Sequence, residues 1–193
     1  MLRRGPTVGD RYLPDGNYRV IINTSQHRIS GLISLSAHLL MPLKTGDQAP
    51  DFTLPSTRGS DFHLRIHAMG KPLILYFYPK DFTSVCTKEA CEFRDAFSLF
   101  RELDVEIIGI SSDNVETHRR FQAAHALPFE LLADEQGKVA SLYKAIIPVL
   151  QVTRRVTYLL DQEQTVAAVY ENLFAADKHV RTMIEKLKGR SLR

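Results

Sequence analysis

The chain has 193 residues and two cysteines, Cys86 and Cys91, whose thiolates are its strongest potential nucleophiles. Cys86 follows an apolar run and a short loop, and it falls in the first turn of a predicted helix. The N–H groups of a first turn are unpaired and the helix dipole favours negative charge there, so a cysteine in that position can have a lowered pKa. We therefore expect Cys86 to act as a nucleophile.

A lowered pKa alone does not make a fast nucleophile. Moving a thiol pKa from its free value to about 6 raises the thiolate fraction at neutral pH only about thirtyfold, and it also weakens each thiolate as a nucleophile. The site must therefore stabilise the charge that develops in the transition state. Candidate hydrogen-bond donors are the Thr83 hydroxyl, the backbone N–H groups around Val85 and Cys86, and an arginine from elsewhere in the chain.

The elements around Cys86 indicate an open α/β sheet. Residues 72–78 form a continuous apolar and aromatic run, which is typical of a strand buried on both faces. Pro79 ends this strand because proline cannot donate to a sheet ladder, and a helix is predicted over residues 84–103. Cys86 is thus expected at the carboxyl end of a strand, where the functional sites of such sheets lie.

The rest of the pattern completes a sheet with helices on both faces. Further strands are predicted at 61–66, 105–111, 129–133, 156–160 and 165–170, and further helices at 114–126 with Asp113 as N-cap, at 137–144 and at 177–187. The last two strands flank a turn and form a hairpin. The fold class is therefore α/β, with a central mixed sheet flanked by helices, the arrangement of a thioredoxin-like fold.

The segment YFYPKDFTSVCTKEACEFRD, residues 76–95, resembles the active-site motif of peroxiredoxins. In that motif a proline, three residues, a threonine, two residues and the peroxidatic cysteine follow one another, and Pro79, Thr83 and Cys86 stand at these places. The wider match, from GDQAPDFTLP onward, is similar to the subgroup called bacterioferritin comigratory protein or peroxiredoxin Q. The segment RRVTYLLD resembles the family strand that supplies the site arginine, which favours Arg155 over Arg154 for that role.

The resemblance implies a peroxiredoxin-type fold and a thiol peroxidase. The Cys86 thiolate would attack the O–O bond of hydrogen peroxide or an organic hydroperoxide and become a sulfenic acid. In this subgroup the resolving cysteine often lies five residues further on, where Cys91 stands, and a thioredoxin-like reductant would then restore both thiols. No metal, flavin or haem is implied, and the expected state is a monomer or a weak homodimer.

Cys86 and Cys91 cannot join while their helix is intact. Five residues along an α-helix separate two Cα atoms by about 8–9 Å, whereas a disulfide needs them within about 7 Å. We therefore predict that the first turn of this helix unwinds in each catalytic cycle.

Other functions compete with this one. A redox sensor or a holdase-type chaperone would also need an accessible cysteine of low pKa, and only repeated turnover separates it from an enzyme. A thiol–disulfide oxidoreductase is disfavoured because no Cys-x-x-Cys is present. Cys91 has an alternative role as a non-redox thiol beside an external resolving thiol. A zinc site is disfavoured because two cysteines supply only half of a tetrahedral ligand set.

Two further expectations concern polar residues near the cysteines. Glu89, one helical turn after Cys86, is expected to pair with an arginine near the site rather than to act on a substrate. The seven histidines are scattered along the sequence, and none of them is assigned a role.

Residues 1–40 differ from the rest of the chain. They hold five arginines and two aspartates, whereas residues 41–193 hold 20 basic and 20 acidic side chains and have no net basic field to attract nucleic acid. The first 40 residues are either a transit segment or an extension outside the functional chain, poorly ordered in both cases. The thioredoxin-like domain is expected at 41–193.

Composition also bounds the compartment. Two cysteines are too few for the disulfide framework of a secreted protein of this length, so a reducing compartment is expected. No run of about 18 apolar residues indicates a membrane span. We expect a cytoplasmic protein, or an organellar one if residues 1–40 are a transit segment.

Overall fold

The structure is a computed structural model that describes residues 11–12, 18–19, 41–147, 150–172 and 176–190. Its backbone contacts divide the chain into two units, Met1–His38 and Leu39–Arg193. In the first unit, β1 (Arg11–Tyr12) pairs antiparallel with β2 (Tyr18–Arg19). The remaining elements and the site belong to the second unit. The prediction of poor order for residues 1–40 falls mostly outside the described residues.

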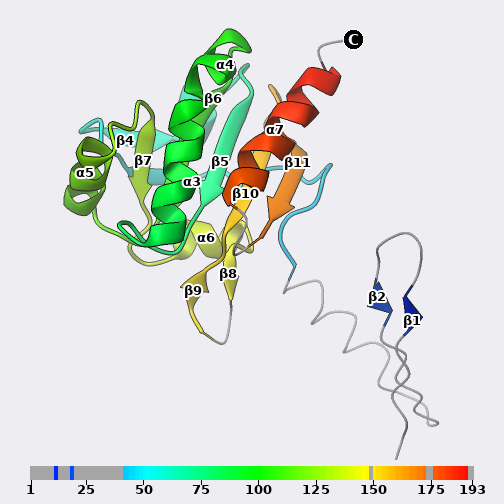
Figure 1. Cartoon of the computed structure of the whole chain (residues 1–193), viewed down its shortest axis with the longest axis horizontal. Helices are drawn as coiled ribbons and strands as arrows, with labels where there is room; N and C mark the ends of the chain where they lie inside the picture. The colour runs from blue at the N-terminus through cyan, green and yellow to red at the C-terminus, as the bar shows by residue number, and fades with distance from the viewer. Residues whose placement is uncertain (1–10, 13–17, 20–40, 148–149, 173–175, 191–193) are drawn as a thin grey trace, which may run out of the picture. The chain divides into compact units, whose positions relative to one another are not determined.

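A five-stranded mixed sheet forms the centre of the second unit (Figure 1). Its strand order is β11-β10-β5-β6-β7, where the bounds are Val166–Glu171, Val156–Leu160, Leu73–Phe77, Glu106–Ser111 and Glu130–Ala133. β5, β6 and β7 are parallel, and β10 runs antiparallel to both β5 and β11. The predicted α/β class, with its mixed sheet and its closing hairpin, is confirmed.

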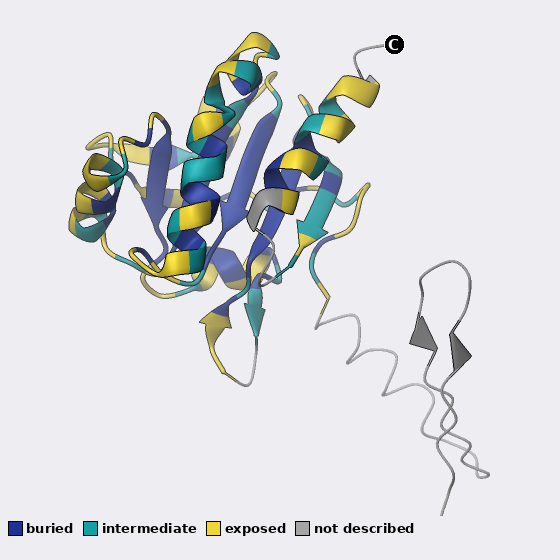
Figure 2. Ribbon diagram, in the orientation of Figure 1, coloured by how far each residue is buried: buried dark blue, intermediate teal, exposed yellow. Residues whose placement is uncertain are grey.

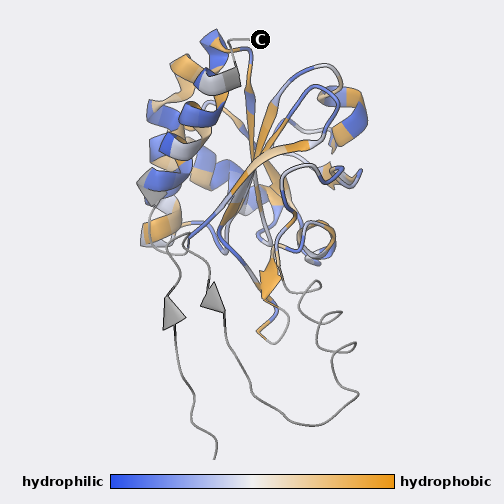
Figure 3. Cartoon of the chain, turned by 90° about the vertical axis from the view of Figure 1, so that its right-hand side faces the viewer, coloured by the Kyte–Doolittle hydropathy of each residue, from blue (hydrophilic) through white to orange (hydrophobic). Residues whose placement is uncertain are grey.

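The central strand β5 is buried on both faces, as its unbroken apolar sequence predicts. Leu73, Leu75 and Phe77 belong to one hydrophobic cluster, and Ile74 and Tyr76 belong to another on the opposite face. Figure 2 shows the central strands buried, the edge strand β11 partly buried and the outer faces of the helices exposed, and Figure 3 shows that the strands of the sheet are largely hydrophobic. The sheet is therefore a rigid platform on which a site can be held.

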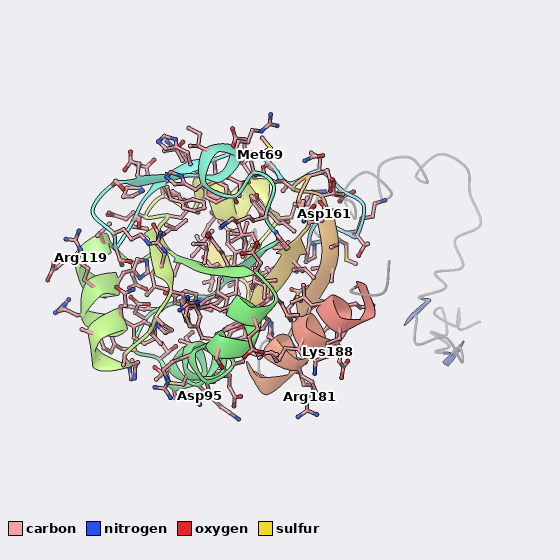
Figure 4. The ribbon with its side chains drawn as sticks, turned by 90° about the horizontal axis from the view of Figure 1, so that it is seen from above. Met69, Asp95, Arg119, Asp161, Arg181 and Lys188 are labelled. Atoms are coloured by element: carbon pink, nitrogen blue, oxygen red, sulfur yellow. The ribbon has the colours of Figure 1, made fainter. Side chains whose placement is uncertain are left out.

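Helices cover both faces of this sheet. The face with Ile74 and Tyr76 is packed by α3 (Ser84–Asp95), α4 (Phe97–Glu102), α5 (Val115–Ala124) and α7 (Ala176–Arg190). The other face is packed by α2 (Leu64–His67), α6 (Lys138–Leu142) and the hairpin of β3 (Thr53–Pro55) with β4 (Asp61–His63). α3 and α7 pack against each other, and they lie side by side in both Figure 1 and Figure 4.

Three local predictions were wrong. The helix predicted at 84–103 is two helices, because Ala96 leaves helical geometry at φ −92° and ψ 1°. The N-cap of α5 is Asn114, whose side chain accepts from the Thr117 N–H at 2.9 Å, whereas Asp113 accepts from the Asp81 N–H at 2.7 Å. The strand predicted at 61–66 ends at His63 and continues as α2.

One short hairpin has no counterpart in the predictions. β8 (Ile146–Ile147) pairs antiparallel with β9 (Val152–Thr153) just before β10. Within the described residues, no helix combines the length and the apolar character needed to cross a membrane.

Candidate active site

The sulfur of Cys86 lies at the start of α3, just beyond the carboxyl end of β5. Thr83 takes an extended conformation, with φ −81° and ψ 146°, and turns the chain into the helix. The helical hydrogen bonds begin with the Thr87 N–H, which donates to the Thr83 carbonyl at 2.8 Å. The N–H groups of the preceding turn are therefore not used by the helix, and such groups stabilise a negative charge.

The Thr83 side chain does not cap the helix. Its hydroxyl donates to the Lys80 carbonyl at 3.1 Å, and its side chain is exposed. A threonine hydroxyl has one hydrogen and two lone pairs, so this hydroxyl is oriented to accept a hydrogen bond from a ligand. The predicted donation from Thr83 to a ligand would require this hydroxyl to rotate away from Lys80.

Arg155 reaches Cys86 because of the register between two strands. Val156, the first residue of β10, pairs with Phe77, the last residue of β5, in an antiparallel register. The residue before β10 therefore lies beside the loop after β5, and the Arg155 Nη2 donates to the Cys86 Sγ at 3.0 Å. Arg154 turns away, since its Nη1 lies 2.9 Å from the Glu171 Oε1. The structure thus brings Arg155, and not Arg154, to the cysteine.

Glu89 is the second partner of Arg155, as expected from its place one turn after Cys86. The Arg155 Nη1 donates to the Glu89 Oε2 in a buried ion pair. Burial raises the pKa of Glu89 to about 7, although the charge and the hydrogen bond of Arg155 oppose this rise. Burial lowers the pKa of Arg155, but Glu89 and Cys86 outweigh that effect and raise it above the usual value. The guanidinium is therefore charged and shared by a sulfur and a carboxylate.

The site is nearly closed around the sulfur. Cys86 is only 2% exposed and Arg155 3% exposed. Only a small ligand, or a local opening of the first turn of α3, can therefore bring an oxygen atom to the sulfur.

A buried polar network holds the loop that leads into α3. The Asp81 carboxylate accepts from the Tyr78 hydroxyl at 2.7 Å and lies 2.8 Å from the His118 Nδ1, while the Asp81 N–H donates to Asp113 at 2.7 Å. Phe82, the next residue, has a positive φ of 58°, a conformation that bulky side chains rarely adopt. The network therefore holds a strained loop beside the cysteine.

Two buried histidines near the site were not predicted. His118 of α5 joins the network of Asp81, and His179 of α7 lies 3.4 Å from the Glu89 Oε1 through its Nδ1. Each occupies an apolar face of an amphipathic helix, where sequence alone does not distinguish it from a core residue. Their role depends on helices that are distant in sequence from residues 79–86, so no local motif points to them.

Cys91 lies on the same intact helix as Cys86 and is half-buried. Both thiols are free in this structure. Because α3 runs unbroken from Ser84 to Asp95, the two cysteines are held at helical spacing, which is too far apart for a disulfide. In the part of the chain that the structure describes, no three His, Cys, Asp or Glu side chains are grouped to hold a metal ion.

Comparison with known proteins places this geometry in a family. Residues 45–169 match the AhpC/TSA family. This chain belongs to the AhpC/TSA family of peroxiredoxins. The peroxiredoxin is 38% identical to a putative peroxiredoxin named bcp from Coxiella burnetii over 153 residues, which cover 76% of this chain and 100% of that protein. It is 36% identical to a chloroplastic peroxiredoxin Q from Suaeda salsa over 163 residues, which cover 81% of this chain and 73% of that protein.

Solved structures agree with these relatives. The crystal structure of the peroxidoxin BcpB from Mycobacterium tuberculosis matches with a TM-score of 0.72 and 34% identity, over 78% of this chain and 99% of that one. Peroxiredoxin Q from Xanthomonas campestris matches with a TM-score of 0.67 and 29% identity, over 72% of this chain and 91% of that one. The predicted family, subgroup and thioredoxin-like fold are confirmed, and the peroxiredoxin is a thiol peroxidase that acts on peroxides.

Proposed function

We propose that Cys86 is the sulfur that reduces the peroxide. Its thiolate attacks one oxygen of a hydroperoxide, the O–O bond breaks, and the leaving oxygen takes a proton to become water or an alcohol. The sulfur is oxidised to a sulfenic acid and the peroxide is reduced. The observation that supports this assignment is the 3.0 Å hydrogen bond from the Arg155 Nη2 to the Cys86 Sγ at the start of a helix.

The other residues of the site act on the transition state. The Arg155 guanidinium stabilises negative charge on the sulfur and on the leaving oxygen. The Thr83 hydroxyl accepts a hydrogen bond from the peroxide and aligns it, and the free N–H groups of the first turn of α3 add further donors. Pro79 ends β5 and starts the loop that brings Thr83 and Cys86 together.

Cys91 resolves the sulfenic acid in this proposal. The Cys91 thiolate attacks the Cys86 sulfur, the hydroxyl leaves as water, and a Cys86–Cys91 disulfide forms. The first turn of α3 must open for this step, because the helix holds the two sulfurs apart. A thioredoxin-like dithiol then reduces the disulfide and returns both thiols, and the enzyme needs no metal, flavin or haem.

The working unit is proposed to be residues 41–193, acting as a monomer or a weak homodimer in a reducing compartment. That compartment is the cytoplasm, or an organelle if residues 1–40 are a transit segment. The relative from Suaeda salsa is named chloroplastic, which supports the second case.

Peroxide consumption coupled to thioredoxin and its reductase tests this proposal. We expect wild type to complete many cycles per site and the turnover rate of Cys86→Ser to be at least about 100-fold lower. Cys91→Ser should consume a single equivalent of peroxide and then stop. Full turnover by Cys86→Ser would contradict the assignment of the nucleophile. A single stoichiometric oxidation of wild type with an intact reducing system would favour the redox sensor instead.

A further inference from the structure

A buried histidine of the C-terminal helix contacts the carboxylate that holds the site arginine. His179 of α7 has no exposed surface, and its Nδ1 lies 3.4 Å from the Glu89 Oε1 and 2.8 Å from the Thr157 Oγ1. Its Nε2 lies 3.0 Å from the Asn172 carbonyl oxygen. The nucleophilic step proposed above makes no use of this residue.

The contacts of the ring determine where its protons lie. A carbonyl oxygen only accepts, so the His179 Nε2 must carry a hydrogen to bond with Asn172. The Nδ1 is therefore the nitrogen that faces Glu89, and it also lies within hydrogen-bond distance of the Thr157 Oγ1. The Tyr170 ring packs edge-on against the imidazole at 4.7 Å, which keeps the ring in this orientation.

Glu89 stands between His179 and Arg155. Its Oε2 accepts from Arg155, while its Oε1 is buried and accepts no hydrogen bond within the described residues. A buried carboxylate oxygen without a donor is costly. A proton between the Glu89 Oε1 and the His179 Nδ1 removes this cost in either position. On Glu89, the carboxyl group donates to the Nδ1, and on His179, the imidazolium donates to the Oε1.

We propose that His179 is a positioning residue that acts on Cys86 through Glu89 and Arg155. The proposal rests on the assignment of Cys86 as the nucleophile. By orienting the carboxylate from the side opposite to Arg155, His179 fixes the plane in which the guanidinium must lie to donate to the sulfur. The C-terminal helix is in this way a part of the active site, although it contributes no group that touches the peroxide.

The shared proton also sets the charge beside the sulfur. Among the described residues, the titratable groups that interact with Glu89 are Arg155 before β10, His179 on α7 and Tyr76 on β5, and Cys86 shares Arg155 with it. Burial raises the pKa of Tyr76 well above its usual value, so the phenol stays neutral. When Glu89 and His179 together hold the proton, the two groups carry no net charge to offset Arg155, and the guanidinium acts more strongly on the thiolate and the peroxide.

A falling limb in the pH profile follows from this arrangement. Burial raises the pKa of Glu89 to about 7, so its carboxyl group releases the proton as the pH rises through that value. The carboxylate then offsets Arg155, and attack by each Cys86 thiolate slows. The falling limb reports the protonation of Glu89 beside His179 and not that of the Cys86 sulfur. A substitution of His179 therefore displaces it.

Rapid-quench measurement of Cys86 oxidation by hydrogen peroxide, across a series of pH values, tests the proposal in a Cys91→Ser background. We expect His179→Phe to slow oxidation at neutral pH by at least about tenfold, because Glu89 loses the contact that orients it and no longer holds Arg155 beside the sulfur. It should also displace the falling limb by at least about half a pH unit. His179→Asn should restore the rate to within about threefold, since its amide N–H can occupy the place of the Nδ1–H.

A matched control comes from the same face of α7. Met183 lies one turn after His179 and is equally buried, so Met183→Ala weakens the packing of the helix without touching the polar chain. We expect it to lower the melting temperature but to keep the wild-type rate and pH profile. A wild-type rate and limb in His179→Phe would overturn the inference, as would an equal loss in Met183→Ala. Failure of the proposed function gives a different result, in which Cys86→Ser still reacts with peroxide.

Discussion

At the scale of single residues, one guanidinium connects the chemistry of the site to its buried interior. Arg155 donates through one nitrogen to Cys86 and through the other to Glu89. This forked geometry is a property of arginine, because the ammonium group of lysine is a point charge that does not present two parallel donors.

Replacement of Arg155 by lysine should therefore be severe although it conserves charge. We expect Arg155→Lys to slow oxidation of Cys86 by about 100-fold, because the sulfur or the carboxylate loses its donor. The control is Arg154→Lys, whose guanidinium faces Glu171, and it should stay within about twofold of wild type. Equal rates for the two variants, measured by the same peroxide assay, would contradict the role of Arg155.

The raised pKa of Glu89 predicts a pH dependence of stability. The folded protein holds this proton up to about pH 7, whereas the unfolded chain releases it near 4.5, so the folded state binds more protons between these values. Folded stability from Glu89 is therefore fully present below 4.5 and declines as the pH rises through about 7.

Chemical denaturation of wild type and Glu89→Gln from pH 4.5 to about 7 measures this decline. The amide side chain at position 89 of the variant does not titrate. Relative to the variant, wild type should lose up to about 3 kcal/mol of unfolding free energy across this interval. A difference between the two proteins that is constant with pH would show that Glu89 does not titrate in the folded state there.

Part of the site could be predicted from sequence for a physical reason. Pro79, Thr83 and Cys86 belong to one continuous strand–loop–helix segment, so their spacing along the chain determines their spacing in space. Arg155 could be predicted only through the family resemblance. His179 could not be predicted, because it meets Glu89, 90 residues earlier in the chain, only through the packing of α7 on α3. An amphipathic pattern also does not distinguish a buried polar histidine from an apolar core residue.

At the scale of elements, α3 has two incompatible tasks in the proposed cycle. As an intact helix it positions Cys86 beside Arg155, and as an opened helix it lets Cys86 meet Cys91. Glu89 lies between the two cysteines, so opening of the first turn also loosens its ion pair with Arg155.

Hydrogen exchange on the reduced and oxidised protein tests this opening. We expect amides at residues 84–90 to lose at least about tenfold of their protection when the Cys86–Cys91 disulfide forms, whereas amides of β6 keep theirs. The reduced protein is the reference state, and a Cys91→Ser sulfenic acid serves as the oxidised control without a disulfide. Undiminished protection in a chain proven to hold the disulfide would refute the unwinding.

The boundaries of elements are harder to predict from sequence patterns than the elements themselves. The strand β5 is predictable because its short apolar run contains branched and aromatic residues and is followed by a proline, which is typical of a strand buried on both faces. The break between α3 and α4 is a single residue, Ala96, whose N–H still donates to Glu92 and whose carbonyl still accepts from Phe100. Apolar spacing continues across it, so the pattern predicts one helix.

At the scale of the whole molecule, the sheet could be predicted because the order of strands and helices permits few topologies. The parallel trio β5, β6 and β7 follows from helical crossovers, and the antiparallel pair β10 and β11 follows from a short turn. The short β8–β9 hairpin could not be predicted, because strands of two residues carry no readable alternation.

The second unit should be sufficient for catalysis. We expect a chain that begins at Met41 to reduce hydrogen peroxide within about twofold of the full chain, because all residues of the proposed site and its sheet lie beyond that point. Steady-state turnover with the same thioredoxin system measures this, with melting temperature as the control for folding. A loss of more than about tenfold in a folded truncated chain would assign a catalytic role to residues 1–40.

In the proposed mechanism one sulfur, that of Cys86, takes an oxygen atom from the peroxide. The most direct measurement treats the Cys91→Ser protein with one equivalent of hydrogen peroxide, traps sulfenic acid with a cyclic diketone, and locates the adduct by mass spectrometry. We expect an adduct on Cys86 in most chains and none in Cys86→Ser. An unmodified Cys86 thiol after the peroxide has been consumed would contradict this mechanism.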